Sequence, residues 1–487
     1  HRKIFRCHCG GIMINLKKNK GDGHQPLYEQ IYNQIKLDIM NGYLSPNERI
    51  LGTRTLARML DVSRNTVDRA YLQLTLEGYI ESRKNAGFYV LELPKVFYTE
   101  RKQILFDKRK IDEELLNREN IIYDLTNSSH TSNLFPKKEW KRHYIAALDQ
   151  LELAEKLSSL QLFQGDIALR KEISRYLERI RGVVCHPRQI IITSGLQQSL
   201  DYLCQFLGKS KNVLMEEPSY PKAREIFVKN SWNISTEKVD NKGLDICNFS
   251  NEINIDMIYT TPSHQFPLGM IMPISRRQKL LEFAEQNDSF IIEDDYDSEL
   301  RYYEKPVPAL KSIDYPDRVI YLGTFSKILS PSFRMSYIVL PEQFTEDFLE
   351  RFKMHNSTVN LINQIALANL LSSGDYDRLV RKMNHIFKKR YEAFQNGFDS
   401  FQVPIKVSHN VSGQYFLVNF PTKINQYEMI KRALDVGVKV YDTMQFWQEE
   451  AECPHEHLFL GFSKIELENI PDCIERLKKA WDIIEKG

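Results

Sequence analysis

The sequence of 487 residues lacks the features that mark several protein classes. It has no apolar run approaching the roughly 18–20 residues that a membrane-spanning helix needs, so no membrane partner is expected. Its cysteines, at 7, 9, 185, 204, 247, 453 and 473, form no regular disulfide framework, which favours a reducing, cytoplasmic location. The formal net charge is only +2, so any affinity for nucleic acid must come from the local placement of charges.

The length predicts more than one domain, because a single hydrophobic core rarely serves so long a chain. Residues 1–24 are rich in Lys and Arg and lack the apolar segment of a signal peptide, so we expect a disordered, basic lead-in. The Cys7-His8-Cys9 segment has no distant pair of ligands, and no metal site is predicted there. Residues 93–120 have balanced charge and few apolar anchors, which indicates a mobile linker.

Residues 25–92 carry the pattern of a small DNA-binding domain. Apolar side chains at helical spacing predict helices over 28–39 and 53–60. Residues 79–90 alternate and turn like a two-stranded hairpin, whose tip at 84–87 would form a wing. The plain alternative is a helical subdomain with solvated arginines on its surface.

A third helix is expected to begin after a tight turn, with Ser63 as its N-cap. A helix that enters the major groove must pack with one face and contact DNA with the other. Arg64 and Arg69 are suited to phosphates or guanine edges. Asn65 and Thr66 can reach a base or a phosphate oxygen. The two faces separate as required, with Val67, Ala70, Tyr71 and Leu74 on one and Arg64, Asn65, Asp68 and Arg69 on the other.

From residue 121 onward, short β-rich runs alternate with amphipathic helices. This alternation predicts a doubly wound α/β sheet with functional loops at the strand ends. We expect a large domain over 121–360 and a smaller α/β domain over 361–487. The predicted strands are 189–193, 212–215, 256–259, 290–293, 319–322 and 337–340.

The segment 323–327 reads Gly-Thr-Phe-Ser-Lys and is followed by Arg334 seven residues after the lysine. It resembles the cofactor lysine of fold-type I aminotransferases, whose amine forms an imine with pyridoxal 5'-phosphate. The resemblance implies that Lys327 binds the cofactor and is the catalytic residue, made nucleophilic by desolvation and neighbouring positive charge. Arg334 would clamp the phosphate, helped by the hydroxyls of Thr324 and Ser326.

The other predicted strand ends supply the remaining cofactor contacts that this resemblance implies. Asp294 would keep the pyridine nitrogen protonated, and Tyr296 would bond the phenolic oxygen of the ring. Each residue alone has an ordinary alternative, such as the end of a strand, and it is their order that favours the site. Phosphate-binding amides are expected from Gly195, Leu196 and Gln197, which follow a strand and begin a helix.

Almost the whole chain, roughly residues 26–480, resembles the MocR-type regulators. These form a subfamily of GntR transcriptional regulators whose effector domain is aminotransferase-like. The resemblance implies an α/β protein with an N-terminal winged helix-turn-helix and a fold-type I aminotransferase-like domain that binds pyridoxal phosphate. The matching segments are 26–31, 53–57, 62–67, 77–80, 217–220, 261–269, 292–299 and 323–334.

The same resemblance implies residue roles and partners. Arg54, Arg64, Thr66 and Gly87 match positions that touch DNA in the family, and Tyr220 should stack on the cofactor ring. The implied partners are double-stranded operator DNA, a small-molecule effector and a second copy of the chain. In the implied head-to-tail homodimer, each winged helix crosses to the large domain of its partner.

Three departures from the family patterns bear on function. Gly52 stands where a proline usually precedes the second helix. Phe459 replaces the arginine that binds the substrate carboxylate in active aminotransferases, and Phe266 replaces an asparagine beside the ring oxygen. Losing a bidentate arginine weakens carboxylate binding, for which Lys222 is a poorer substitute.

The sequence therefore predicts a transcriptional regulator that senses pyridoxal phosphate, alone or as its imine with an amino compound. Two alternatives stay open. One is an active aminotransferase with an accessory DNA-binding domain, and the other is a DNA-binding protein with a purely structural α/β body.

Overall fold

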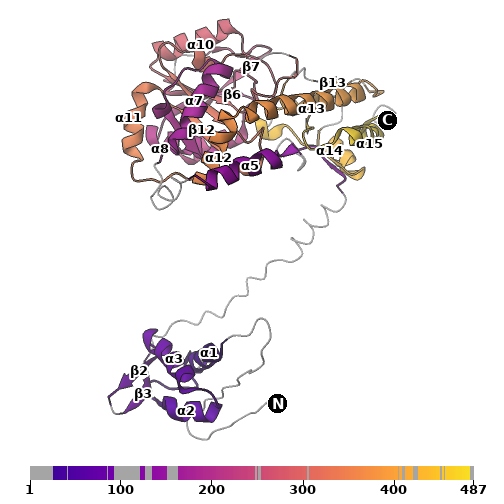
Figure 1. Cartoon of the computed structure of the whole chain (residues 1–487). Coiled ribbons are helices and arrows are strands. Elements are labelled where there is room, and N and C mark those ends of the chain that lie inside the picture. Colours follow the sequence, from indigo (N-terminus) through magenta and orange to yellow (C-terminus); the bar gives the residue numbers. More distant parts are fainter. Residues whose placement is uncertain are drawn as a thin grey trace. The chain divides into compact units, whose positions relative to one another are not determined.

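The computed structural model divides into two compact units, His1–Ile111 and Asp112–Gly487, which are treated separately (Figure 1). The predicted lead-in at 1–24 and the whole of the predicted linker at 93–120 lie outside the residues that the structure describes. No helix of the described residues is long and apolar enough to cross a membrane. The described residues are 26–40, 42–84, 86–92, 121–126, 134–150, 163–246, 249, 254–303, 307–403, 405–407, 412–420, 426–449, 452–454 and 456–482.

The N-terminal unit contains the three predicted helices, α1 (Leu27–Met40), α2 (Thr53–Leu60) and α3 (Arg64–Leu76). The tight turn after α2 is made by Asp61, whose left-handed backbone (φ 52°) lets its N–H reach the carbonyl of the last helical turn. Ser63 is the N-cap of α3, and its hydroxyl oxygen accepts the backbone N–H of the residue three positions later at 3.2 Å.

The packing of α3 follows its two predicted faces. Val67, Ala70, Tyr71 and Leu74 are all buried. The Tyr71 hydroxyl donates to the Leu51 carbonyl at 2.7 Å, so even the polar atom of this core residue is satisfied. These contacts fix the orientation of the helix and leave its opposite face to solvent.

The predicted hairpin is confirmed as β2 (Ile80–Arg83) and β3 (Gly87–Val90), an antiparallel pair. A two-residue strand, β1 (Arg49–Ile50), adds to the other edge of β3 and gives the order β1-β3-β2. The sequence did not predict β1, because two residues are too short to show a strand period.

In the described part of the second unit, eight strands form a mixed sheet in the order β5-β12-β11-β10-β9-β6-β7-β8. All the predicted strands are confirmed, with ends that differ from the prediction by at most two residues. β7 and β8 were not predicted, because β7 is a polar, half-exposed strand near the edge. The strands are β5 (Ile190–Thr193), β6 (Asn212–Glu217), β7 (Asn233–Asp240), β8 (Gly243–Leu244), β9 (Met257–Thr260), β10 (Phe290–Asp295), β11 (Val319–Thr324) and β12 (Ser336–Val339).

Both faces of this sheet are buried, because successive side chains of a strand point to opposite sides. Ile292 of β10 packs with α8, α9 and α11, whereas the adjacent Ile291 packs with α10 on the opposite face. Helix α7 also covers the second face, near β5. The helices are α7 (Ile167–Arg181), α8 (Leu196–Leu207), α9 (Pro221–Lys229), α10 (Ile274–Gln286) and α11 (Glu342–Arg351).

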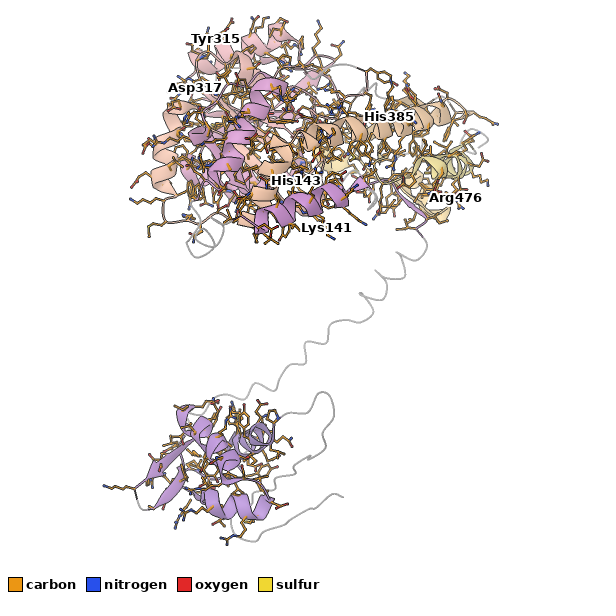
Figure 2. The ribbon with its side chains drawn as sticks, viewed as in Figure 1. Lys141, His143, Tyr315, Asp317, His385 and Arg476 are labelled. Atoms are coloured by element: carbon orange, nitrogen blue, oxygen red, sulfur yellow. The ribbon has the colours of Figure 1, made fainter. Side chains whose placement is uncertain are left out.

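Two helices lie between the large sheet and the C-terminal part of the chain. α5 (Lys137–Leu148) packs against α12 (Leu361–Ser372). The buried His143 of α5 (Figure 2) contacts Asp375 at 2.7 Å. Asp375 is the first residue of the long helix α13 (Asp375–Phe398), so this pair ties α5 to the start of the C-terminal domain.

The small domain is built around a second sheet with the order β13-β14-β16. A separate parallel pair joins β15 to β4, although β4 precedes the whole large sheet in the sequence. The chain therefore passes through the small domain before it forms the large one, and the predicted boundaries at 121 and 361 stay predictions. The elements are β4 (Tyr123–Asp124), β13 (Lys406–Val407), β14 (Tyr415–Asn419), α14 (Gln426–Asp435), β15 (Val438–Lys439), β16 (His457–Gly461) and α15 (Ile470–Trp481).

Candidate cofactor site and DNA-binding surface

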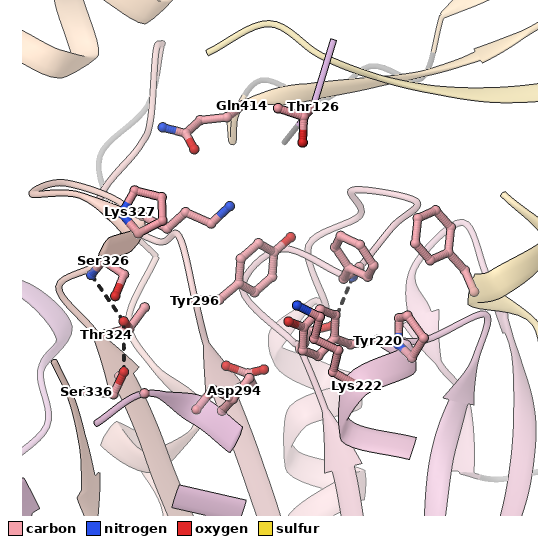
Figure 3. Close-up of a pocket in the computed structure, with 18 of the residues that line it drawn as sticks. Thr126, Tyr220, Lys222, Asp294, Tyr296, Thr324, Ser326, Lys327, Ser336 and Gln414 are labelled. Carbon is pink, nitrogen blue, oxygen red and sulfur yellow. Dashed lines mark hydrogen bonds between the residues drawn. The ribbon is translucent and has the colours of Figure 1, made fainter. Parts of the chain in front are cut away.

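A cavity of about 410 Å³ lies where the large sheet meets the small domain (Figure 3). The parallel strands end at the same edge of the sheet, so residues distant in sequence meet there. Gln197 is not among the residues that line the cavity, and its side chain is exposed one residue into α8, so the predicted phosphate contact of its backbone amide stays a prediction. Every other predicted cofactor residue lines it: Gly195, Leu196, Tyr220, Asp294, Tyr296, Thr324, Ser326, Lys327 and Arg334.

Lys327 follows β11, and its amine reaches over the ring of Tyr296 into the cavity (Figure 3), 5.9 Å from the ring centroid. Burial lowers the pKa of the Lys327 amine, and a lower pKa leaves more of the neutral, nucleophilic form. The carboxylates of Asp297 and Asp294 oppose this shift. The predicted contribution of desolvation thus has a structural basis, and that of neighbouring positive charge stays a prediction.

Asp294 and Asp295, adjacent at the end of β10, have different environments. Asp295 forms a buried ion pair with Arg181 at 2.7 Å and is structurally satisfied. Asp294 lines the cavity and accepts a hydrogen bond from the Tyr259 hydroxyl at 2.5 Å. Burial raises the pKa of the Asp294 carboxyl to about 7. A cationic ring nitrogen placed beside this carboxylate would relieve its desolvation, so the residue fits its predicted partner.

Tyr296 is held by a group that the sequence did not single out. Its hydroxyl lies 3.0 Å from Nδ1 of His264, and the same nitrogen lies 2.8 Å from a carboxylate oxygen of Asp297. His264 also stacks between the rings of Tyr296 and Tyr415. The signal available in the sequence was the matching segment 261–269, but nothing local shows that its histidine faces a tyrosine 32 residues later.

Gly195 and Arg334 form a cradle of the kind that a phosphate occupies. Gly195 precedes α8 with φ +114°, and a Cβ at this position would overlap the Arg334 guanidinium. The bare backbone therefore lets the guanidinium lie against the N-terminus of α8, where helix amides and a fixed positive charge converge. Thr324 accepts hydrogen bonds from the Ser326 backbone N–H at 3.2 Å and the Ser336 hydroxyl at 2.9 Å.

The departures from aminotransferase patterns also lie at this cavity. Phe266 and Phe459 both line it and both are buried. Lys222 lines it too, but its side chain is exposed. The cofactor end of the cavity thus carries the aminotransferase residues, while its other end is aromatic.

In the N-terminal unit, most of the predicted DNA-contacting residues are exposed, whereas Thr66 and Gly87 are half-buried. Arg64 and Asn65 are exposed at the start of α3, and Arg64 pairs loosely with Asp68 at 3.3 Å. The exposed Arg69 lies over the Tyr28 ring, 4.3 Å from its centroid, which restricts its reach. Contact with DNA stays a prediction for the whole set: Arg54, Ser63, Arg64, Asn65, Thr66, Arg69 and Gly87.

Comparison with known families decides the identity of both units. Residues 27–90 match the bacterial regulatory proteins of the gntR family, and residues 124–455 match aminotransferase class I and II. The chain belongs to the MocR-type GntR regulators. Among the described residues, no group of three or more His, Cys, Asp or Glu side chains could hold a metal ion.

Relatives of this regulator share nearly its full length. The HTH-type transcriptional regulator YdeL of Bacillus subtilis is 35% identical over 94% of this chain and 97% of its own. The pyridoxine biosynthesis regulator PdxR of Corynebacterium glutamicum is 30% identical over 77% of this chain and 79% of its own. The structure of Pyrococcus horikoshii kynurenine aminotransferase, in complex with PMP, superposes with a TM-score of 0.69 at 25% identity, covering 80% of this chain and 98% of that one. Pyridoxal phosphate is the cofactor of this fold, and the cavity residues fit it.

The Gly195 cradle can be tested with two alanine substitutions at opposite ends of α8. Gly195→Ala should weaken pyridoxal-phosphate binding at least about tenfold, because it displaces a charge-assisted contact of Arg334. Gly208→Ala is the matched control, since Gly208 also has a positive φ (+92°) but no atom within 4 Å of the added Cβ. Cofactor titration followed by absorbance would show the difference, and equal losses in the two variants would contradict the cradle.

The raised pKa of Asp294 predicts that the stability of the cofactor-free protein depends on pH. Its folded pKa of about 7 exceeds the ordinary value of 3.8, so stability falls as pH rises from about 4 to 7 and then levels off. Asp294→Asn removes this titration and should stabilise the cofactor-free protein by roughly a few kcal/mol at pH 8 and by less at pH 5. Urea unfolding at both pH values measures this, and a gain that does not grow with pH would refute it.

Proposed function

We propose that this regulator couples occupation of its pyridoxal-phosphate cavity to binding of operator DNA. The observation that carries the proposal is the meeting of Lys327, Asp294 and Arg334 at one cavity, in a chain that also presents the capped helix α3. A DNA-binding unit alone would not need a buried lysine beside two carboxylates. An ordinary enzyme would not need a recognition helix.

When bound, pyridoxal phosphate supplies an aldehyde that reacts reversibly with amines and a ring that withdraws electrons. The chain provides the positions. Arg334 and the start of α8 would hold the phosphate, Asp294 would hold the ring nitrogen, and Tyr220 would pack on the ring. Lys327 would bind the aldehyde carbon. His264 keeps the Tyr296 hydroxyl directed at the cavity, since its Nδ1 contacts both that hydroxyl and Asp297.

The cavity is suited to sensing because two domains build it. Asp294, Lys327 and Arg334 come from the large domain, whereas Gln414 and Phe459 come from the small one. In Figure 3, Gln414 lies on the opposite side of the cavity from Asp294. A ligand that contacts both sides favours one arrangement of the domains, and such a preference is what coupling to DNA affinity requires.

The effector in this proposal is pyridoxal phosphate, alone or as its imine with an amino compound. The relative PdxR is named as a regulator of pyridoxine biosynthesis, which supports a vitamer as ligand. Full aminotransferase activity is the second candidate, favoured by the presence of Lys327, Asp294, Tyr296 and Arg334 at the cofactor end. Phe459 argues against it, and repeated conversion of an amino donor by the purified protein would establish it.

Assembly and location form the remaining parts of the proposal. The resemblance to MocR-type regulators supports a head-to-tail homodimer in which winged helices are exchanged. The DNA-binding unit has to meet the chromosome, which supports a cytoplasmic location.

Lys327→Ala should abolish the visible absorbance of the lysine-linked cofactor, because in the described part of the chain the other lining lysine, Lys222, is exposed. Lys222→Ala is the control, since Lys222 lines the same cavity from an exposed position. A Lys327→Ala protein that stays yellow after dialysis would disprove the cofactor assignment.

Arg64→Ala should weaken DNA binding by about 5- to 100-fold, the cost of one phosphate or base contact, and leave cofactor loading unchanged. The probe is a duplex that the wild-type protein selects from a random-sequence pool, measured by fluorescence anisotropy at fixed salt. Arg351→Ala removes the same charge from an exposed site in the other unit and should leave DNA affinity unaltered. Parallel loss of DNA binding and cofactor in Arg64→Ala would contradict the separation of roles.

A further inference from the structure

Three phenylalanines form one side of the cofactor cavity, and we call Phe266, Phe446 and Phe459 the aromatic wall. All three line the cavity, and their side chains are only 5–7% exposed. Their ring centroids lie 5.1 Å (266 to 446), 5.3 Å (446 to 459) and 6.0 Å (266 to 459) apart. Each ring thus contacts the other two, which makes the wall a single apolar surface.

The aromatic wall adjoins the residues that would hold the cofactor ring. Phe266 packs edge-on against Tyr220 at 5.6 Å and against Tyr296 at 5.9 Å. Phe459 stacks on Tyr415 at 4.6 Å. A ligand attached to the cofactor would therefore extend its substituent along this wall.

The wall is fixed in place by polar contacts on its outer side. The Phe446 carbonyl accepts the Ser219 N–H at 2.9 Å and an Arg224 guanidinium N–H at 2.7 Å. The Gln448 N–H donates to the Glu217 carboxylate at 2.5 Å. These bonds tie a small-domain segment to the large domain, so the surface is formed before a ligand arrives and costs little to order.

Charge is unevenly distributed around the cavity. Besides Lys222, the cationic residues among its described lining are Arg334, which lies at the Gly195 cradle, and Lys327, whose amine lies over the Tyr296 ring at the proposed cofactor position. Lys222 is exposed. A carboxylate placed against the aromatic wall would lose its hydration without gaining a buried cation, and this is strongly unfavourable.

We propose that the amino compound sensed by this regulator is a primary amine with an apolar, aromatic-sized substituent and no carboxylate next to the amine. This inference rests on the proposed function. It assigns Phe266, Phe446 and Phe459 as the residues that determine ligand specificity.

A matched pair of ligands tests the inference on the full chain loaded with pyridoxal phosphate. 2-Phenylethylamine and L-phenylalanine differ only by the carboxylate beside the amine. We expect calorimetric titration to give at least about tenfold tighter binding of 2-phenylethylamine, because a buried, unpaired carboxylate costs more than one decade in affinity. Binding of phenylalanine at equal or greater affinity would overturn the proposal, as would failure of 2-phenylethylamine to bind.

Substitution of the wall gives an independent measurement. Phe459→Arg should raise phenylalanine affinity at least about tenfold and lower that of 2-phenylethylamine, because the guanidinium supplies a carboxylate partner. Phe459→Leu keeps the surface apolar and should keep the preference for the amine. If Phe459→Arg folds and leaves the wild-type preference intact, the wall does not select the ligand.

The absorbance of the loaded protein, recorded before any titration, separates the two levels of failure. A protein that never takes up the cofactor overturns the proposed function and this inference with it. A protein that loads the cofactor but does not discriminate between the two ligands overturns the inference alone.

Discussion

The cofactor site depends on ionisable side chains that are buried at the edge of the large sheet. Asp294 and Lys327 are placed there by strands that are buried on both faces, so neither can move to solvent without disturbing the sheet. Burial shifts both pKa values toward the neutral forms. Such a site is unfavourable while it lacks a partner of complementary charge, and the phosphate, pyridine and aldehyde of the cofactor complement the arginine, carboxylate and amine around it.

The two ends of the cavity differ in how closely they match an aminotransferase. The cofactor end keeps the residues of an aminotransferase, and Gly195 keeps the bare backbone against which Arg334 lies. At the other end, Phe459 stands where active aminotransferases have the arginine that binds the substrate carboxylate. Phe459 packs with Phe266 and Phe446. Under the proposed function, this arrangement keeps the contacts to the cofactor and changes which ligands can bind beside it.

The sequence predicted the elements with strong local signals and missed those made by long-range packing. The strands of the large sheet and the Ser63-capped helix α3 were predictable, because buried apolar runs and N-cap residues are local patterns. The contact between Tyr259 and Asp294 joins neighbouring strands, and the contact between His264 and Tyr296 joins two loops. Neither contact can be recognised from the spacing of residues in the sequence. Gln197 was placed at the phosphate through its backbone amide, and its exposed side chain leaves that prediction as it was.

Strand β4 connects the small domain to the cofactor cavity. Tyr123 and Asp124 pair with β15, and their side chains are held by Asp472 and Tyr441 at 2.8 and 2.7 Å. Two residues later, Thr126 lines the cavity itself. β4 is therefore attached to the small domain, and a shift of that domain around a bound ligand would move β4 and Thr126 together.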